Sequence, residues 1–428
     1  MVQGTEESIE VVVKNGLCCG CGTCAGICPK NAITLVIDEN KGVYIPNINK
    51  NKCACCGICY DACPGHAVDF KALNKDIFGG VPEDILMGSY QACYLGHAID
   101  NAVRYNAASG GAITAILLFA LETGMIDGAL VTRMRKDRPL EPEPFIARTR
   151  DEILEAAKSK YCPVPTNITL NKILDSKDGE RFAVVGLPCH IHGIRKAESI
   201  NKRLKDKIVL RLGIFCSHTD TFWQTKFLLK KLNISEENVA KIDYRGDGWP
   251  GMMSILLKNG RKVRVPFSEA VALHGLWIHA LPRCLFCCDL TAELADISCG
   301  DPWLPEIEAS GEKMGKSIVV SRTNVGNAVC MKAKQCGYMQ LEEIDPEKVK
   351  QSGNMMESKK RDITVRFLIR RLFNRAVPEY NTTFLRPSSI NYLRSLLVYF
   401  NVDISYYTCL RRFVILISRV ESWLFQKF

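Results

Sequence analysis

The 428-residue sequence lacks the features of an exported or membrane-spanning protein. Its start, MVQGTEESIEVVVK, is acidic and has no basic stretch leading into a long apolar run, so we expect no secretory signal. No apolar run in the C-terminal region reaches the roughly 18 residues that a membrane-spanning helix needs. With 47% hydrophobic and 24% charged residues, the composition is that of a globular protein. We therefore expect a cytoplasmic protein of two or three domains.

The sequence also has almost no net positive charge outside its C-terminal tail. Residues 359–428 contain 13 Lys or Arg and 4 Asp or Glu, whereas the net charge of the whole chain is +10. This distribution does not indicate the basic groove or aromatic platform of a nucleic-acid-binding protein, so we expect no nucleic-acid partner. Apolar residues of the tail recur at helical spacing, and arginines interrupt them at Arg394, Arg411, Arg412 and Arg419.

Two interpretations of this predicted helical extension, residues 353–428, remain open. The helices are either solvated or packed on each other, or they form an amphipathic anchor. Such an anchor would lie on an anionic membrane surface, as a peripheral contact, or on an acidic partner subunit.

Cysteine, in contrast, is abundant, with 21 residues. In a reducing cytoplasm clustered thiols indicate metal or redox centres rather than disulfides. The N-terminal region contains an internal repeat, LCCGCGTCAGICPKNAITLVID followed by KCACCGICYDACPGHAVDF. Each copy carries a Cys-x2-Cys-x2-Cys-x3-Cys-Pro run and then a short apolar strand, predicted at 32–37 and 67–70. This spacing is typical of a bacterial-type ferredoxin that binds two [4Fe-4S] clusters.

The two runs predict which thiols share a cluster. In such ferredoxins the first three cysteines of a run bind one cluster, and the fourth binds the other cluster. The ligands of the first cluster are then Cys18, Cys21, Cys24 and Cys63. Those of the second cluster are Cys53, Cys56, Cys59 and Cys28. Cys19 and Cys55 fall outside this register and are interpreted as spectators, and a zinc site is disfavoured by the two matching Cys-Pro runs.

The central region has the pattern of a mixed α/β body. Short, continuous apolar runs predict strands buried on both faces at 128–132, 181–186 and 208–215. An apolar helix is predicted over 109–124, and Asn259-Gly260 predicts a hairpin. No Gly-x-Gly-x-x-Gly follows a strand, which excludes the Rossmann fingerprint.

A second set of cysteines lies in this body. Cys189 and Cys216 each follow a predicted strand, and ligands of α/β sheets bind at the carboxyl ends of strands. We expect these two thiols to converge, with Cys284 and Cys287 as the other pair. Buried structural cysteines are the alternative. The nearby His190, His192 and His218 are interpreted as ordinary loop histidines.

Five segments of the body resemble one family in their order along the chain. They are RYNAASGGAITAILLFALETGMIDGALV, SKYCPVPTN, VVGLPCHIHGIRK, LGIFC and RCLFCCDLTAELADISCGDPW. Across roughly residues 88–350 the chain resembles the beta subunit of coenzyme F420 hydrogenases and dehydrogenases, a family of flavin and iron-sulfur proteins. The resemblance implies FAD and a third [4Fe-4S] cluster, with Cys189, Cys216, Cys284 and Cys287 as ligands and Cys288 or Cys299 as possible substitutes.

The resemblance also implies a place for the flavin. Ser109-Gly110-Gly111 opens a helix, and free amide groups together with the helix dipole favour a phosphate there. Taken alone, this motif is more typical of an ordinary helix start. Thr114 lies one turn inside the helix, and Lys160 adds positive charge.

The parts together predict an F420-dependent iron-sulfur flavoprotein oxidoreductase of the α+β class. Its predicted domains are a ferredoxin module at 1–80, an FAD and [4Fe-4S] body at 81–352, and the tail. Coenzyme F420 is expected to exchange hydride with FAD, and single electrons to pass through the clusters to an electron-accepting subunit or ferredoxin. Hydride transfer between stacked rings requires positioning, so no catalytic side chain is predicted. Arg104 and Arg283 are candidate contacts for the anionic substrate tail.

Two other functions remain open. The same scaffold acts on other organic substrates in polysaccharide- or chlorophyll-related pathways. A subunit without flavin would instead serve as a non-catalytic electron relay.

Overall fold

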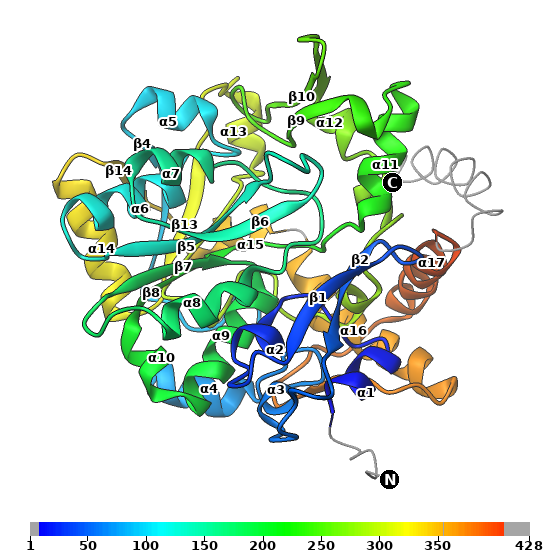
Figure 1. Ribbon diagram of the computed structural model, residues 1–428. Helices are drawn as coiled ribbons and strands as arrows, with labels where there is room; N and C mark the ends of the chain where they lie inside the picture. Colours follow the sequence, from blue (N-terminus) through cyan, green and yellow to red (C-terminus); the bar gives the residue numbers. More distant parts are fainter. Residues whose placement is uncertain (1–7, 354, 406–428) are drawn as a thin grey trace.

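A mixed sheet of eight strands forms the centre of the computed structural model, which describes residues 8–353 and 355–405 (Figure 1). Its strand order is β14-β4-β13-β12-β8-β7-β5-β6. The strands are β4 (Ala92–Ala98), β5 (Gly128–Met134), β6 (Pro142–Ala147), β7 (Phe182–Gly186), β8 (Ile208–Ile214), β12 (Ile297–Gly300), β13 (Ser317–Ser321) and β14 (Met339–Glu343). The four neighbours β12, β8, β7 and β5 run parallel, and the other pairings are antiparallel. The predicted strands at 128–132, 181–186 and 208–215 are confirmed as β5, β7 and β8.

Helices cover both faces of this sheet, which explains why its central strands are continuously apolar. One apolar core lies between the sheet and α6 and α14, and another lies between the sheet and α8 and α9. The helices of this region are α5 (Asn101–Asn106), α6 (Ala112–Glu122), α7 (Arg150–Glu155), α8 (Leu170–Leu174), α9 (Pro188–Ile200), α10 (Lys202–Lys207), α13 (Pro305–Ala309) and α14 (Asn324–Gln335), with the 3-10 turn η1 (Thr166–Thr169). The predicted helix over 109–124 starts later than expected, because its N-cap Gly111 has a φ of +77°.

A smaller sheet packs on the helix α11 (Phe222–Lys231), and its order is β11-β10-β9. Its strands are β9 (Val239–Asp243), β10 (Met252–Leu257) and β11 (Lys262–Pro266). The hairpin predicted at Asn259-Gly260 is confirmed between β10 and β11. The short elements α12 (Phe267–Ala270), η3 (His274–Leu276) and η4 (Pro282–Phe286) connect this sheet to the region of the body cysteines, and η2 (Glu236–Asn238) lies between α11 and β9.

The N-terminal segment, residues 8–80, packs against α9 and η1 (blue in Figure 1). It contains α1 (Ile9–Lys14), α2 (Thr23–Gly26), β1 (Ile33–Asp38), β2 (Val43–Ile48), α3 (Ile58–Asp61), β3 (Ala67–Val68) and α4 (Phe70–Phe78). The strand predicted at 32–37 is present as β1 and pairs with β2. The contact with the body is close: a Cβ added at Gly26 would lie 1.9 Å from the carbonyl oxygen of Asn167.

The strand predicted at 67–70 is shorter than expected. Only Ala67 and Val68 form a strand, and they pair with β15 (Glu379–Tyr380) from the C-terminal region. The chain turns into α4 because the Asp69 side chain accepts a hydrogen bond from the Ala72 N–H at 2.9 Å, which caps the helix.

The described part of the C-terminal region is helical, as predicted, and consists of α15 (Pro346–Ser352), α16 (Met356–Leu372) and α17 (Ser389–Ser405). The tail is partly self-packed, since Arg394 of α17 pairs with Asp362 of α16, but α16 is not solvated, because Lys359, Lys360 and Arg366 are at most 2% exposed within the protein. The predicted interruptions at Arg411, Arg412 and Arg419 lie outside the described residues. Within those described, we find no helix with the length and apolar character to cross a membrane.

Candidate redox centre

A cavity of about 590 Å³ lies at the carboxyl ends of the parallel strands. Thr132 of β5, Gly186 of β7, Cys216 after β8 and Asp301 after β12 all line it. The start of α6 lines it as well, through residues 107–109 and 111–114. This is where open α/β sheets bind their ligands, and the volume is within the range of cofactor pockets.

The loop before α6 is fixed to β13 by hydrogen bonds. The Ser109 hydroxyl donates to the Lys316 carbonyl, and the Gly110 N–H donates to Ser317 Oγ at 2.9 Å. A Cβ at Gly110 would lie 2.7 Å from the Gly96 carbonyl oxygen, so the close approach requires glycine. No side chain caps α6 in the structure described, and its first turn borders the cavity at Thr114. The N-terminus of α6 is therefore suited to an anionic group.

Lys160 lines the cavity, but its ammonium group is already hydrogen-bonded to backbone oxygens. Its ammonium donates to the carbonyl oxygens of Ala156, Ala157 and Lys158, the last at 2.9 Å. Burial lowers the pKa of Lys160 to about 7. Lys160 therefore stabilises the turn at residues 156–158, and all three of its N–H groups have backbone acceptors.

The two arginines suggested as substrate contacts also have partners within the protein. Arg104 donates to the Gly315 carbonyl and Glu312. Arg283, 4% exposed, donates to the carbonyls of Gly65 and Pro64 and to the Tyr380 hydroxyl. Arg283 therefore connects the body to the second N-terminal cysteine run.

The histidines interpreted as loop residues are buried, and two of them lie on α9. His190 Nδ1 accepts a hydrogen bond from the Leu187 N–H at 3.0 Å, so its Nε2 carries the proton and donates to the Val164 carbonyl. Burial lowers the pKa of His190 to about 4. His190 is thus a neutral part of the cavity wall, whereas His192 pairs with Asp289 at 2.8 Å.

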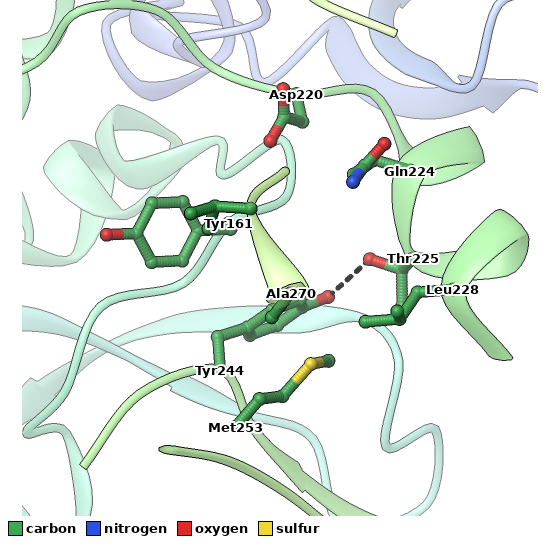
Figure 2. Close-up of a pocket in the computed structure, with 9 residues that line it drawn as sticks. Tyr161, Asp220, Gln224, Thr225, Leu228, Tyr244, Met253 and Ala270 are labelled. Atoms are coloured by element: carbon green, nitrogen blue, oxygen red, sulfur yellow. Dashed lines mark hydrogen bonds between the residues drawn. The ribbon is translucent and has the colours of Figure 1, made fainter. Parts of the chain in front are cut away.

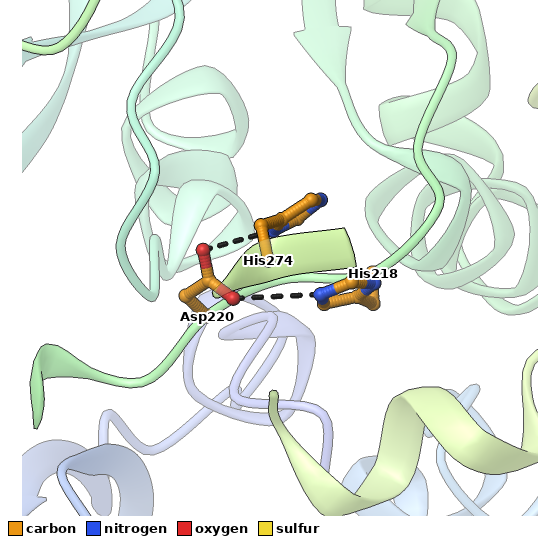
Figure 3. A group of neighbouring side chains, drawn as sticks. All are labelled: His218, Asp220 and His274. Carbon is orange, nitrogen blue, oxygen red and sulfur yellow. Dashed lines mark hydrogen bonds and ion pairs between the residues drawn. The ribbon is translucent and has the colours of Figure 1, made fainter. Parts of the chain in front are cut away.

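His218, Asp220 and His274 form a cluster at the cavity wall (Figure 3). His274 Nδ1 lies 2.9 Å from one Asp220 oxygen, and His218 Nε2 lies 3.5 Å from the other. Burial opposes ionisation of Asp220, but His274 and His218 outweigh it and hold the pKa of Asp220 well below its usual range. Sequence reasoning missed this cluster because His274 comes from η3, more than fifty positions after Asp220.

The ligand atoms of these three residues lie within 4.8 Å of one another, but the rings are poorly oriented for a shared metal. The imidazoles of His218 and His274 stack at 3.7 Å with an interplanar angle of 18°. A metal bound by both rings would have to lie near both ring planes, which face-to-face stacking prevents. His274 Nε2 also lies 3.1 Å from Ser217 Oγ, so we interpret the cluster as a hydrogen-bonded chain from Asp220 to Ser217.

A second, much smaller cavity of about 10 Å³ lies beyond Asp220 (Figure 2). Tyr161 and Asp220 line both cavities, and the Thr225 hydroxyl and Tyr244 hydroxyl are 2.8 Å apart at its far side. This volume is close to the smallest that holds one water molecule.

Another part of the wall of the large cavity carries an ion pair with aromatic neighbours. Arg245 is 1% exposed and donates to both oxygens of Asp301, at 2.6 and 2.9 Å. Its guanidinium lies 4.1 Å from the ring centre of Phe267, and Phe267 and Trp303 line the cavity. This wall offers flat apolar surface for an aromatic ring system.

The four body cysteines come together next to this cavity. Cys189 lies at the start of α9, Cys216 follows β8, Cys284 is in η4 and Cys287 follows it. Burial, and then the neighbouring Cys216 and Cys287 thiols, raise the pKa of Cys284. A hydrogen bond with Cys19, then burial, and also the Cys216 thiol raise the pKa of Cys189.

The two suggested substitute ligands pack in other places. Cys288 is fully buried among apolar residues of the core beneath α9. Cys299 lines the large cavity and also packs in the core on the opposite side of the sheet, where Cys330 is its thiol neighbour.

The N-terminal cysteines form two groups. Burial and then the Cys63 and Cys18 thiols raise the pKa of Cys24, which places Cys63 with the first run. Burial and then the Cys28 thiol raise the pKa of Cys59, which places Cys28 with the second run. Backbone N–H groups point at sulfur atoms: Gly20 donates to Cys18 and Gly65 to Cys63, at 3.4 and 3.3 Å.

Cys19 lies between the N-terminal and body thiols. Hydrogen bonds with Cys189 and Cys21 lower the pKa of Cys19, so its thiol contacts a member of each group. The interpretation of Cys19 as a spectator missed this position. Spacing gave no signal for it, because the contact depends on how the N-terminal segment packs against α9.

Family models match most of the region that builds this centre. The model of the coenzyme F420 hydrogenase/dehydrogenase beta subunit N-terminal part matches residues 93–171, and that of its C-terminal part matches residues 179–347. The chain belongs to this beta subunit family. The resemblance inferred from the five sequence segments is therefore confirmed.

Individual relatives of this beta-subunit-family protein are archaeal. It is 30% identical over 270 residues to the coenzyme F420 hydrogenase subunit beta of Methanothermobacter thermautotrophicus, covering 61% of this chain and 89% of the relative. It is 27% identical over 354 residues to the coenzyme F420-dependent sulfite reductase of Methanocaldococcus jannaschii, covering 79% of this chain and 50% of that protein.

A solved structure, the F420-reducing [NiFe] hydrogenase complex from Methanosarcina barkeri, contains a chain with a similar fold. The TM-score is 0.54 at 26% identity, covering 69% of this chain and 98% of that chain. The N-terminal cysteine runs and α16 lie outside the segments that the two family models match.

Proposed function

We propose that this protein is an F420-linked oxidoreductase that converts between hydride transfer and single-electron transfer. The observation that carries the proposal is the position of Cys216, which lines the large cavity and whose thiol also belongs to the body cysteine group. A ligand in the cavity is thus adjacent to four thiols that share one site. The names of the relatives support coenzyme F420 as the substrate.

The cavity residues fit a flavin. The uncapped N-terminus of α6 suits a phosphate group, and the wall with Phe267 and Trp303 suits a ring system. When bound, FAD would exchange hydride with coenzyme F420 and release its electrons one at a time. The chain contributes neutral His190 and the Ser217–His274–Asp220 hydrogen-bonded chain to orient these groups.

The thiols fit iron-sulfur clusters by their number and grouping. Twelve cysteines in three groups of four, with backbone N–H donors aimed at the sulfur atoms, match the ligand set of three [4Fe-4S] clusters. We propose Cys18, Cys21, Cys24 and Cys63 for the first cluster and Cys53, Cys56, Cys59 and Cys28 for the second. The third cluster takes Cys189, Cys216, Cys284 and Cys287.

Anaerobic mixing with reduced coenzyme F420 tests the proposal. We expect the visible absorbance of the bound flavin to bleach first and the cluster signals in electron paramagnetic resonance to follow. A flavin that stays oxidised while artificial donors reduce it would exclude coenzyme F420 as the substrate and favour another organic substrate. Protein purified anaerobically without flavin would favour the electron-relay function.

A further inference from the structure

Lys359 is a buried cation that the C-terminal extension brings to the body cysteines. It lies in the first turn of α16, beyond residue 347 where the family match ends, and it is 2% exposed. Its ammonium donates to the Asp289 carbonyl oxygen at 2.9 Å. The Cys287 thiol donates to the same oxygen at 3.4 Å. The ammonium and this thiol therefore meet at one backbone atom.

The next residue, Lys360, shows how a buried lysine is ordinarily accommodated. It is 1% exposed and lies 2.6 Å from a carboxylate oxygen of Glu293. For Lys359, by contrast, the residues that the structure describes provide no carboxylate at ion-pair distance. A buried charge without a counter-charge is costly, so burying this ammonium calls for negative charge nearby.

The body thiols are the available source of that charge. Burial lowers the pKa of Lys359, but Cys287, Cys216 and Cys284 outweigh it and raise the pKa above its usual value. Cysteines that bind a cluster are thiolates, and the cluster with its four thiolates is an anion. Asp289, which is hydrogen-bonded to His192 through one oxygen, adds a smaller negative contribution than these thiols, and the guanidinium of Arg283 donates to backbone carbonyls and Tyr380.

We propose that Lys359 is the fixed counter-charge of the third cluster and that α16 thereby raises the reduction potential of this cluster. The inference rests on the proposed third cluster. Reduction adds one electron and no proton, which makes the cluster more negative by one charge. A nearby ammonium stabilises the reduced state more than the oxidised state, because attraction grows with the charge.

The substitution Lys359→Gln tests this inference, because glutamine removes the charge and still carries an N–H donor at the end of a slightly shorter side chain. Lys359→Arg restores the charge. Lys360→Met removes a neighbouring buried lysine whose partner is Glu293 and serves as the matched control. Redox titration of the full-length holoprotein, followed by electron paramagnetic resonance, measures the potential of each cluster, and iron analysis gives their number.

We expect the third cluster of Lys359→Gln to be harder to reduce. At the wild-type midpoint potential, its ratio of reduced to oxidised cluster should fall about tenfold, a shift of about 59 mV for one electron. The N-terminal clusters, Lys359→Arg and Lys360→Met should keep their wild-type potentials. Loss of about four irons in Lys359→Gln, restored in Lys359→Arg, would also support the inference, because it would show that the cluster needs the charge.

Two results would overturn it. An unchanged third-cluster potential in a Lys359→Gln protein with about twelve irons would remove the role of Lys359 and leave the proposed function intact. About eight irons in the wild-type protein would remove the third cluster, and the inference with it.

Discussion

At the scale of single residues, the surroundings of each cysteine separate ligand candidates from packing residues. Cys330 is fully buried among apolar side chains, and burial alone raises its pKa. Cys24 and Cys284 are instead surrounded by other thiols, which raise their pKa values beyond the effect of burial. Thiols crowded in this way remain protonated at neutral pH unless a cation binds them, so each group is suited to a metal cluster.

The exchange of the fourth ligand between the two N-terminal runs is a testable consequence. We expect Cys63→Ser to damage the first-run cluster and Cys28→Ser to damage the second-run cluster, since each thiol lies with the opposite run. Each variant should lose about four irons per chain. Iron analysis and the cluster signals in electron paramagnetic resonance check this result.

The exposed Cys55 provides the control for these variants. Cys55→Ser should retain the wild-type iron content and spectrum. If Cys63→Ser alters the signal of the second-run cluster instead, the crossed assignment is wrong.

At the scale of secondary structure, the start of α6 decides whether the cavity binds a phosphate. Thr114 is in the first turn and 8% exposed. We expect Thr114→Asp to weaken FAD binding at least about tenfold, because its charge repels the phosphate. The helix dipole favours an acidic residue at this position, so stability should not fall by helix weakening. Titration of FAD into apoprotein, with thermal unfolding in parallel, measures both effects.

Thr114→Asn is the matched control, because it has the shape of aspartate without the charge. It should retain most of the FAD affinity. Equal losses in both variants would indicate a steric effect and contradict a phosphate site at this helix end.

The hypothesis that the C-terminal tail contacts a membrane now concerns α17 rather than residues 359–428 as a whole. Removal of the whole segment would take Lys359, Lys360 and Arg366 out of the core, so it is not a clean test. On α17 the side chains of Ile390, Leu393, Leu396 and Phe400 are each at least 50% exposed. The buried side of the helix pairs with α16, where Arg394 lies 2.7 Å from Asp362.

We expect the double substitution Leu393→Asp and Leu396→Asp to abolish sedimentation with anionic lipid vesicles, because it places two negative charges on this face. Val81→Asp with Ile85→Asp introduces the same charge between α4 and β4 and should leave vesicle binding unchanged. Failure of the wild-type protein to bind such vesicles would remove the membrane hypothesis.

The local pattern of apolar residues in the sequence predicts some strands correctly and others poorly. The strands β5, β7 and β8 are continuously apolar because both faces are covered, and this signal is visible in the sequence. The end of the second repeat forms a shorter strand than its apolar run predicts, because Asp69 caps α4 there.

The candidate site also has parts that the sequence predicts and parts that it does not. The twelve proposed cluster cysteines are predicted from spacing and resemblance, whereas the positions of Cys19, His274 and Lys359 depend on contacts between distant segments. Such contacts leave no periodic signal in the sequence.

At the scale of the whole molecule, the N-terminal segment and the body are joined where their thiols are closest. Lys196 donates to the Cys63 carbonyl at 2.8 Å, and Arg283 donates to the Gly65 carbonyl at 2.9 Å. The Asn167 amide connects Thr23 with the His190 carbonyl. These buried links hold the first-run thiols against α9, with Cys19 between them and Cys189. With the proposed clusters bound, this arrangement predicts that electrons pass from the cavity to the body cluster and then to the N-terminal clusters.

This order predicts the effect of removing the body cluster alone. In Cys284→Ser we expect reduced coenzyme F420 still to bleach the flavin, because Cys284 does not line the cavity. The N-terminal clusters should then be reduced at least about a hundredfold more slowly, since the intermediate carrier is missing. Rapid mixing followed by freeze-quench electron paramagnetic resonance measures both steps in one experiment.

Dithionite should reduce the N-terminal clusters of the variant as fully as those of the wild type, which controls for their integrity. Reduction of these clusters by coenzyme F420 at the wild-type rate would show that electrons bypass the body thiols.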